Sequence, residues 1–155
     1  AQLEAHRAIV FKVAGMYCRQ PEDRDDLAQE IAAQLWRAWP GFDPARAAVS
    51  TWMYRIALNV AISFVRAEAP KRRRTEPLDD ALHDVADPGA HDHEGAQHLQ
   101  LLQRFIARQA PLDRALLLLY LDRRPQREIA EILGLSESNV STKVSRLKQR
   151  IRTEL

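Results

Sequence analysis

Apolar residues recur at spacings of three and four along most of the chain, and this period predicts amphipathic α-helices. In the N-terminal part the pattern covers residues 2–18, about 22–39 and 50–66. It resumes at Leu99 and continues towards the C-terminus. No run of residues alternates as a strand would, and no internal repeat occurs. The sequence therefore predicts an all-α protein.

A change of composition divides this helical pattern into two parts. Residues 70–98 contain three prolines, two glycines and seven acidic side chains, a composition typical of a flexible linker. We therefore expect two small helical domains. The first is a three-helix bundle over residues 1–69, and the second is a four-helix domain over residues 99–155. A chain of 155 residues is long enough for two such domains.

The end of the second domain, residues 125–152, has the pattern of two helices joined by a tight corner. Pro125 stands where the first helix begins, and a proline suits the first turn of a helix. Gly134 stands where helix termination needs a left-handed backbone, and Ser136 is suited to cap the second helix. A short helix, a turn containing glycine and a second helix together form the helix-turn-helix pattern.

The second of these helices is apolar on one side and polar and basic on the other. The polar side carries Asn139, Thr142, Lys143, Arg146 and Arg150. One interpretation is that this face binds DNA, because asparagine and arginine can each form two hydrogen bonds with a base edge in the major groove. The alternative is a helical hairpin whose outer face is only solvated. Charge favours DNA, because residues 99–155 hold 11 basic and 6 acidic side chains, whereas residues 1–69 hold 8 of each.

The helix predicted over residues 50–66 is apolar on almost every side and rich in aromatic residues, as expected for the centre of a bundle. Its polar exceptions follow one another at spacings of four, four and three, and therefore lie on one line. They are Arg55, Asn59, Ser63 and Arg66. One interpretation is a solvated strip. The other is a surface for phosphates, since the basic run Lys71–Arg74 follows it.

The sequence contains no constellation of catalytic side chains, so we do not expect an enzyme. Cys18 lies in an apolar helical pattern, and as a single cysteine it has no internal disulfide partner. His91, His93 and His98 gather in the linker, but without a cysteine pair or a second cluster they predict no metal site, and we expect no cofactor. With no apolar run long enough to cross a bilayer and no visible signal peptide, we expect a cytoplasmic protein.

Three stretches in this order resemble the extracytoplasmic-function (ECF) group of the sigma-70 family, the small bacterial sigma factors of RNA polymerase. Residues 25–44 are similar to the family's helix that binds the polymerase clamp. Residues 50–66 are similar to its promoter-melting helix, and residues 111–151 to its helix-turn-helix domain. The resemblance implies a subunit that binds core RNA polymerase, recognises the −35 and −10 promoter elements and helps to open the DNA.

The resemblance also implies which residues make each contact. The clamp helices of the largest polymerase subunit would be bound by Asp26, Gln29, Glu30 and Gln34. The −10 element would be held by Trp52, Tyr54, Arg55, Asn59, Ser63 and Arg66, with Lys71, Arg72 and Arg73 in a loop after that helix. The −35 element would be read by Ser138, Asn139, Ser141, Thr142, Lys143 and Arg146. Many members have a glycine–threonine pair at 138–139 and a lysine at 141, so the promoter sequence of this chain does not follow from the family.

As partners the resemblance implies core RNA polymerase, including the flap of its second-largest subunit, promoter DNA and an anti-sigma protein. Two alternatives stay open. One is a free-standing helix-turn-helix repressor or activator whose first domain senses a ligand or dimerises, and the other is an adaptor that binds only a partner protein. We also expect acidic patches on the first domain to attract basic patches on the second, which would make the free chain compact and poor at binding DNA.

Overall fold

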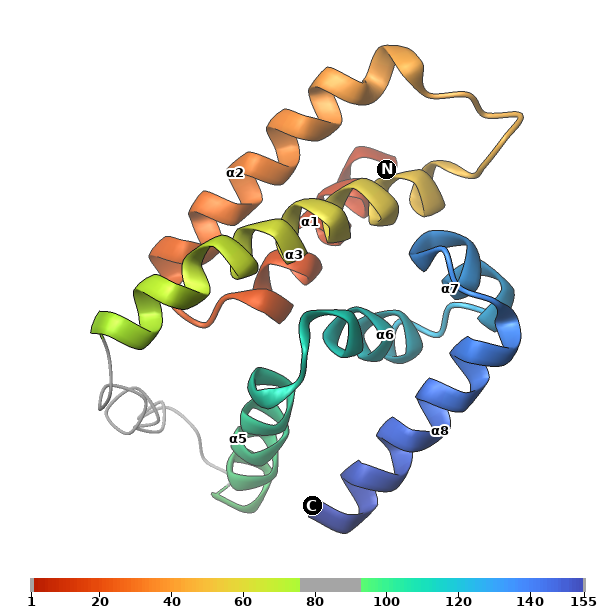
Figure 1. Cartoon of the computed structure of the whole chain (residues 1–155). Coiled ribbons are helices and arrows are strands. Elements are labelled where there is room, and N and C mark those ends of the chain that lie inside the picture. The colour runs from red at the N-terminus through yellow and green to blue at the C-terminus, as the bar shows by residue number, and fades with distance from the viewer. Residues whose placement is uncertain (1, 76–92, 155) are drawn as a thin grey trace.

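The computed structural model describes residues 2–75 and 93–154, and every regular element in these ranges is a helix (Figure 1). The N-terminal half consists of α1 (Gln2–Tyr17), α2 (Pro21–Ala38), the short 3-10 helix η1 (Trp39–Gly41) and α3 (Val49–Thr75). The C-terminal half consists of α5 (His93–Arg108), α6 (Pro111–Leu121), α7 (Gln126–Leu133) and α8 (Glu137–Glu154). Within these described ranges the all-α prediction, with three α-helices followed by four, is confirmed.

The helix α2 begins and ends where its local sequence requires. Pro21 occupies its first turn, where the missing amide hydrogen costs nothing, and Glu22 and Asp23 complement the positive end of the helix dipole. One face buries Leu27 and Ile31 in the core of the bundle. The opposite face is open to solvent, and this exposed face becomes important below.

The helix α3 is longer than the sequence pattern predicts. We expected it to end near Arg66, with the basic run in a loop, but it continues to Thr75 and places Lys71, Arg72 and Arg73 on helical backbone. The residues around Pro70 are alanine, glutamate, lysine and arginine, which are strong helix formers. Similarly, α5 begins at His93, six residues before the predicted start at Leu99.

The helix-turn-helix has the local chemistry that its sequence predicts. Gly134 adopts a left-handed backbone with φ 68°, and the amide of Leu135 donates to the carbonyl of Ala130 at 3.0 Å. The hydroxyl of Ser136 then accepts a hydrogen bond from the amide of Asn139 at 3.1 Å and so caps α8. The corner and the cap fix the angle at which α8 leaves α7.

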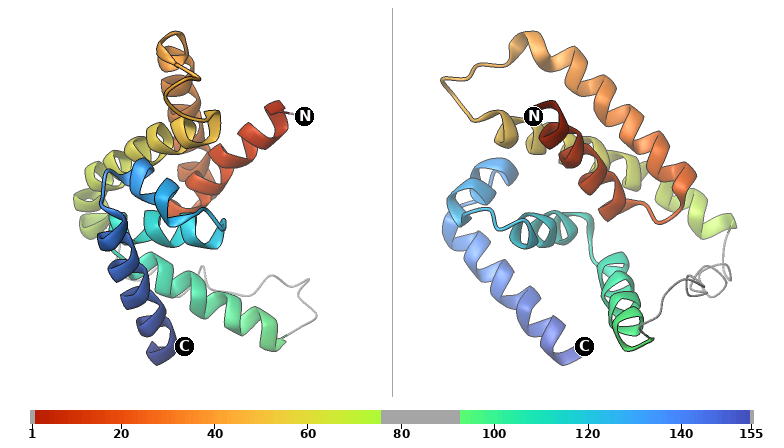
Figure 2. Two further views of the ribbon diagram at one scale, coloured as in Figure 1. Left: turned by 90° about the vertical axis from the view of Figure 1, so that its right-hand side faces the viewer. Right: turned by 180° about the vertical axis from the view of Figure 1, so that it is seen from behind.

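The two halves share one continuous hydrophobic core, with α6 at its centre (Figures 1 and 2). The helix α6 contacts α1 and α3 of the N-terminal half and α7 and α8 of the C-terminal half. Leu116 and Leu119 of α6 are fully buried, and the hydroxyl of Tyr17 on α1 donates to the carbonyl of Pro111 at 2.7 Å. The halves are therefore packed together. Within the described ranges, no helix is both long enough and apolar enough to traverse a lipid bilayer.

Candidate nucleic-acid interface

The polar face of α8 is open to solvent. Ser138, Asn139, Thr142 and Arg146 are exposed, whereas Ser141 and Lys143 are half-buried at its edges. Arg150, at the far end of the same face, has a different role. Its guanidinium donates to Gln109 Oε1 at 2.9 Å and lies 3.6 Å from a carboxylate oxygen of Asp113. Arg150 therefore ties α8 to the start of α6 and is not free for DNA.

The polar line on α3 is only partly open. Asn59, Ser63 and Arg66 are exposed along the middle of the helix. Arg55 is also exposed, but its guanidinium donates to the carbonyl of Glu131 on α7 at 2.9 Å. The line therefore begins underneath the first helix of the helix-turn-helix. The side chains of Lys71, Arg72 and Arg73 lie outside the described residues.

Two aromatic residues predicted to hold the −10 element are covered in this structure. Tyr54 is fully buried between the two halves of the chain. Trp52 is half-buried, and its ring centroid lies 5.8 Å from that of Trp39 and 5.1 Å from that of Phe42. These three rings form an aromatic cluster at the junction of α2 and α3. In this conformation the exposed part of the line is polar, without the aromatic surface on which bases stack.

The predicted polymerase-binding residues lie on the solvent-facing side of α2. Asp26, Gln29 and Glu30 are exposed, and the amide of Gln34 donates to Glu30 Oε1 at 3.3 Å. Trp36 lies seven residues after Gln29 on the same side of the helix, and 82% of its surface is exposed. The sequence pattern did not single out Trp36, although a tryptophan off the apolar stripe of an amphipathic helix is a usable signal. Large exposed aromatic side chains of this kind often anchor protein interfaces.

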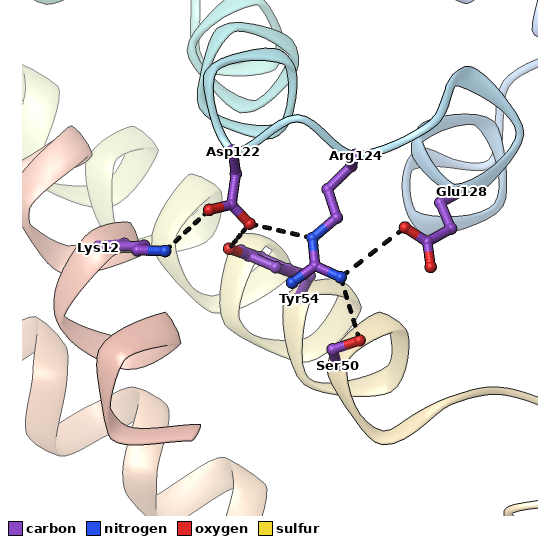
Figure 3. A network of polar contacts seen from close by, with 6 residues as sticks. All are labelled: Lys12, Ser50, Tyr54, Asp122, Arg124 and Glu128. Atoms are coloured by element: carbon purple, nitrogen blue, oxygen red, sulfur yellow. Dashed lines mark hydrogen bonds and ion pairs between the residues drawn. The ribbon is translucent and has the colours of Figure 1, made fainter. Parts of the chain in front are cut away.

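A network of polar contacts joins the two halves, and we call it the clasp (Figure 3). It consists of Lys12 on α1, Ser50 and Tyr54 on α3, Asp122 and Arg124 in the turn after α6, and Glu128 on α7. Asp122 is at its centre. One of its carboxylate oxygens accepts a hydrogen bond from the Lys12 ammonium at 2.8 Å. The other accepts from the Tyr54 hydroxyl at 2.8 Å and from the Arg124 Nε at 3.0 Å.

Arg124 extends the clasp in two further directions. Its Nη1 donates to the hydroxyl of Ser50 at 3.3 Å and lies 3.8 Å from a carboxylate oxygen of Glu128. Its guanidinium also lies over the ring of Tyr54, 5.1 Å from the ring centroid. Arg123, between Asp122 and Arg124, has φ 59°, a left-handed conformation that is uncommon for a residue with a side chain. The side chain of Arg123 is exposed, whereas Asp122 and Arg124 on either side of it belong to the clasp.

The environment of the clasp shifts the pKa of Asp122 and the pKa of Tyr54 in opposite directions. Partial burial alone would raise the pKa of Asp122, but the hydrogen bonds from Lys12, Tyr54 and Arg124 together lower it below its ordinary value. Burial, reinforced by the hydrogen bond to Asp122, raises the pKa of the Tyr54 hydroxyl. The stabilisation from the Asp122 carboxylate is therefore present above the ordinary carboxyl pKa and is lost as the pH falls through the lowered pKa. Both shifts move the titration of Asp122 and of Tyr54 further from neutral pH.

The sequence did not predict the clasp. It predicted acidic patches on the N-terminal half facing basic patches on the C-terminal half. At the contact, the N-terminal half contributes the cation Lys12 and the C-terminal half contributes the anion Asp122. Lys12 looks like an ordinary solvated residue on α1, and Asp122 looks like a turn residue. Their partnership across 110 positions has no local signal. Of the three histidines near the linker, His91 and the side chain of His93 lie outside the described residues.

Comparisons with known proteins match the two halves separately. Residues 3–70 match the family model "Sigma-70 region 2", and residues 99–151 match "Sigma-70, region 4". The chain is 31% identical over 133 residues to the ECF RNA polymerase sigma factor RpoE of Cereibacter sphaeroides, covering 84% of this chain and 71% of that protein. It is 30% identical over 143 residues to SigW of Bacillus subtilis, covering 86% and 75%. With SigG of Mycobacterium tuberculosis it shares 27% over 158 residues, covering 84% of this chain but 41% of SigG.

Proposed function

The chain belongs to the ECF group of the sigma-70 family of RNA polymerase sigma factors, and from this membership we propose that it holds promoters through two separate anchors. In this proposal α8 reads the −35 element, and the polar line of α3 holds the opened −10 element. Core polymerase binds the exposed face of α2. The chain positions and opens DNA, and we propose no catalytic step for its own residues.

The observation that carries the proposal is the geometry of the helix-turn-helix. The Gly134 corner and the Ser136 cap present Asn139, Thr142 and Arg146 on one exposed face of α8. A single α-helix fits the major groove, where these side-chain types pair with adenine and guanine edges. We propose that Lys143, which is half-buried beside this face, contacts phosphate. Such a face positions the chain on duplex DNA and does not separate the strands.

Strand opening is assigned to α3 in the N-terminal half. Asn59, Ser63 and Arg66 offer hydrogen-bond donors along one exposed line, and Arg55 extends it once α7 moves away. Single strands are held by backbone contacts and by stacking on aromatic rings. We propose that Trp52 and Tyr54 supply that stacking, and that Lys71, Arg72 and Arg73 continue the phosphate track.

Polymerase binding is assigned to both halves. Asp26, Gln29, Glu30 and Gln34 on α2 present acidic and amide groups that complement basic clamp helices of the largest subunit, with Trp36 as an apolar anchor. Leu99 and Leu101 are exposed on α5 and offer an apolar surface to the flap of the second-largest subunit. An anti-sigma protein in the cytoplasm would compete for the same surfaces.

Reconstituted transcription tests the proposal. Core RNA polymerase should capture the chain at micromolar concentration, and the complex should select promoter DNA from a random library and produce run-off transcripts from it. Core polymerase alone, on the same templates, is the control. Capture without promoter selection would support an adaptor. Selective binding of duplex DNA by the chain without capture would support a free-standing regulator.

Replacing Arg146 with alanine should weaken binding of the −35 duplex by about 1–3 kcal/mol if the guanidinium bonds to a guanine edge, because that contact is lost without replacement. A titration of the selected duplex and of a scrambled duplex separates base reading from phosphate contact. The loss should be confined to the selected duplex. Equal losses on both duplexes would assign Arg146 to the phosphate backbone. Arg152→Ala, which removes an exposed arginine near the end of the same helix, is the matched control.

A further inference from the structure

We propose that Thr142 identifies a thymine in the −35 element by contact with its methyl group, next to an adenine that is read by Asn139. The inference rests on the proposed function and adds the bases that this face of α8 prefers. It depends on how the structure uses the hydroxyl of Thr142 and the backbone amide of Asn139. The order of the bases follows from the positions of these residues along the helix.

The hydroxyl of Thr142 is used within α8 itself. It donates to the carbonyl of Ser138, four residues earlier, at 3.0 Å. This bond to the preceding turn fixes the rotamer of the side chain, because the hydroxyl and the methyl group are attached to the same carbon. The side chain of Thr142 is exposed. The hydroxyl proton is therefore committed to the helix, and the methyl group is the branch that is left for a partner.

Thymine is the base that presents a methyl group in the major groove, and the methyl group of threonine is one of the apolar groups that contact it. Guanine offers only acceptors on that edge, so a side chain that reads guanine must supply a donor. Thr142 has already given its donor to Ser138. Its oxygen can still accept from the amino group of adenine or cytosine, and this contact requires a hydroxyl, whereas the methyl contact does not.

The cap of α8 leaves the side chain of Asn139 available for a base. The cap uses the backbone amide of Asn139, which donates to the Ser136 hydroxyl at 3.1 Å. The side chain of Asn139 is exposed. An asparagine amide can both donate to and accept from adenine, which offers N7 and its amino group in the major groove. Because the cap holds the first turn of α8, Asn139 and Thr142 keep a constant spacing.

The positions of the side chains along α8 predict the order of the bases. A helix rises about 1.5 Å per residue, so Thr142 lies about 4.5 Å beyond Asn139, and Arg146 lies about 6 Å beyond Thr142. Base pairs are stacked about 3.4 Å apart. For a helix that follows the groove, we therefore expect the thymine about one base-pair step from the adenine and about two steps from a guanine bound by Arg146.

Deoxyuridine tests the methyl contact, since it pairs as thymidine does and lacks only the methyl group of the base. The thymidines of the selected −35 duplex are replaced one at a time, and each duplex is titrated with the whole chain. Replacement at a single position, about one step from the adenine, should weaken binding roughly fourfold, the factor that corresponds to one methyl group lost from an apolar contact. Replacement of the other thymidines should have little effect.

Two substitutions at Thr142 separate the methyl group from the hydroxyl. Thr142→Ser keeps the bond to Ser138 and removes the methyl group, so it should bind the thymine duplex roughly fourfold more weakly and should not distinguish thymine from deoxyuridine. Thr142→Val keeps a methyl group in place and removes the hydroxyl, so it should still distinguish the two duplexes. A hydroxyl that accepted from adenine or cytosine would give the reverse, with binding retained in Thr142→Ser and lost in Thr142→Val.

Thr153→Ser is the matched control. Thr153 is exposed on the same helix, and its hydroxyl donates to the carbonyl of Gln149 at 2.9 Å, the same kind of bond that Thr142 forms. It lies about 17 Å beyond Thr142 along the axis, outside the stretch from Asn139 to Arg146. Thr153→Ser should change neither the affinity for the thymine duplex nor the difference between thymine and deoxyuridine. Equal losses in Thr142→Ser and Thr153→Ser would assign the effect to the helix and not to the methyl contact.

Two further results would overturn the inference and leave the proposed function standing. One is a selected −35 duplex in which no thymine responds to deoxyuridine, and the other is a deoxyuridine effect that is unchanged in Thr142→Ser. Failure of the proposed function looks different. In that case the chain with core polymerase would select no −35 duplex at all, and the inference would fall with it.

Discussion

Leu116→Ala is expected to lower the free energy of unfolding by about 2–5 kcal/mol, the range found when a fully buried leucine is truncated. Leu116 is 0% exposed on α6, the helix that contacts both the N-terminal pair α1 and α3 and the C-terminal pair α7 and α8. A cavity there would lie in the middle of the shared core. Since domains of this size are stable by only about 5–15 kcal/mol, the loss is a large part of the total.

Urea denaturation followed by two probes would measure this effect and test the continuity of the core. The three tryptophans, Trp36, Trp39 and Trp52, all lie in the N-terminal half, so their fluorescence reports on that half alone. Far-ultraviolet circular dichroism reports on both halves. The two midpoints should fall together in Leu116→Ala, although the substitution lies in the C-terminal half. A fall seen by circular dichroism without any change in the fluorescence midpoint would show that the halves unfold independently.

A leucine outside the core provides the control for that experiment. Leu101 on α5 is 42% exposed, and Leu101→Ala should change the free energy of unfolding by no more than about 0.5 kcal/mol. Both variants replace leucine with alanine in a helix, so they change helix propensity equally. The difference between their free energies of unfolding therefore reports the loss of buried packing at Leu116.

Features of this fold that depend on neighbouring residues were predictable from sequence. The left-handed Gly134 and the Ser136 cap each follow from the chemistry of a few adjacent positions. The polar faces of α2 and α8 follow from helical periodicity for the same reason. The predicted end of α3 near Arg66 was wrong, because the composition of the following residues was interpreted as that of a linker, whereas the helix continues to Thr75.

Features that depend on distant residues were not predictable. Tyr54 belongs to a stretch that resembles a promoter-melting helix, and nothing near it indicates that its hydroxyl meets Asp122, 68 positions away. Such pairs depend on how the two halves pack against each other and not on the residues next to them in sequence. The net charges of the halves predicted that acidic groups of the N-terminal half would meet basic groups of the C-terminal half. The ion pair is the reverse, with Lys12 in the N-terminal half and Asp122 in the C-terminal half, because a net charge does not show which side chains lie at the contact. The clasp therefore had to be found in the structure.

The double charge reversal Asp26→Arg/Glu30→Arg is expected to abolish run-off transcription by weakening the capture of core polymerase at least roughly a hundredfold. The two carboxylates lie four residues apart on the exposed side of α2, so both face the same partner surface. If that surface is the basic clamp, reversal replaces two attractions by two repulsions, and like charges forced together at an interface cost several kcal/mol. Buried residues of α2, such as Leu27, are untouched, so the bundle should keep its stability.

Comparison of the wild type, a neutral variant and the reversed variant tests whether the loss of polymerase capture depends on charge. Asp26→Asn/Glu30→Gln removes both charges at constant size and should give an intermediate loss of capture, less than that of the reversal, and the loss should shrink as salt rises. Binding of the −35 duplex by the free chain is the internal control, since α8 is distant in sequence and carries its own face. Polymerase capture that is equal for the wild type, the neutral variant and the reversed variant would remove this face of α2 from the polymerase interface. The exposed Trp36 on the same helix would then be the next residue to replace, because an apolar anchor would persist through every change of charge.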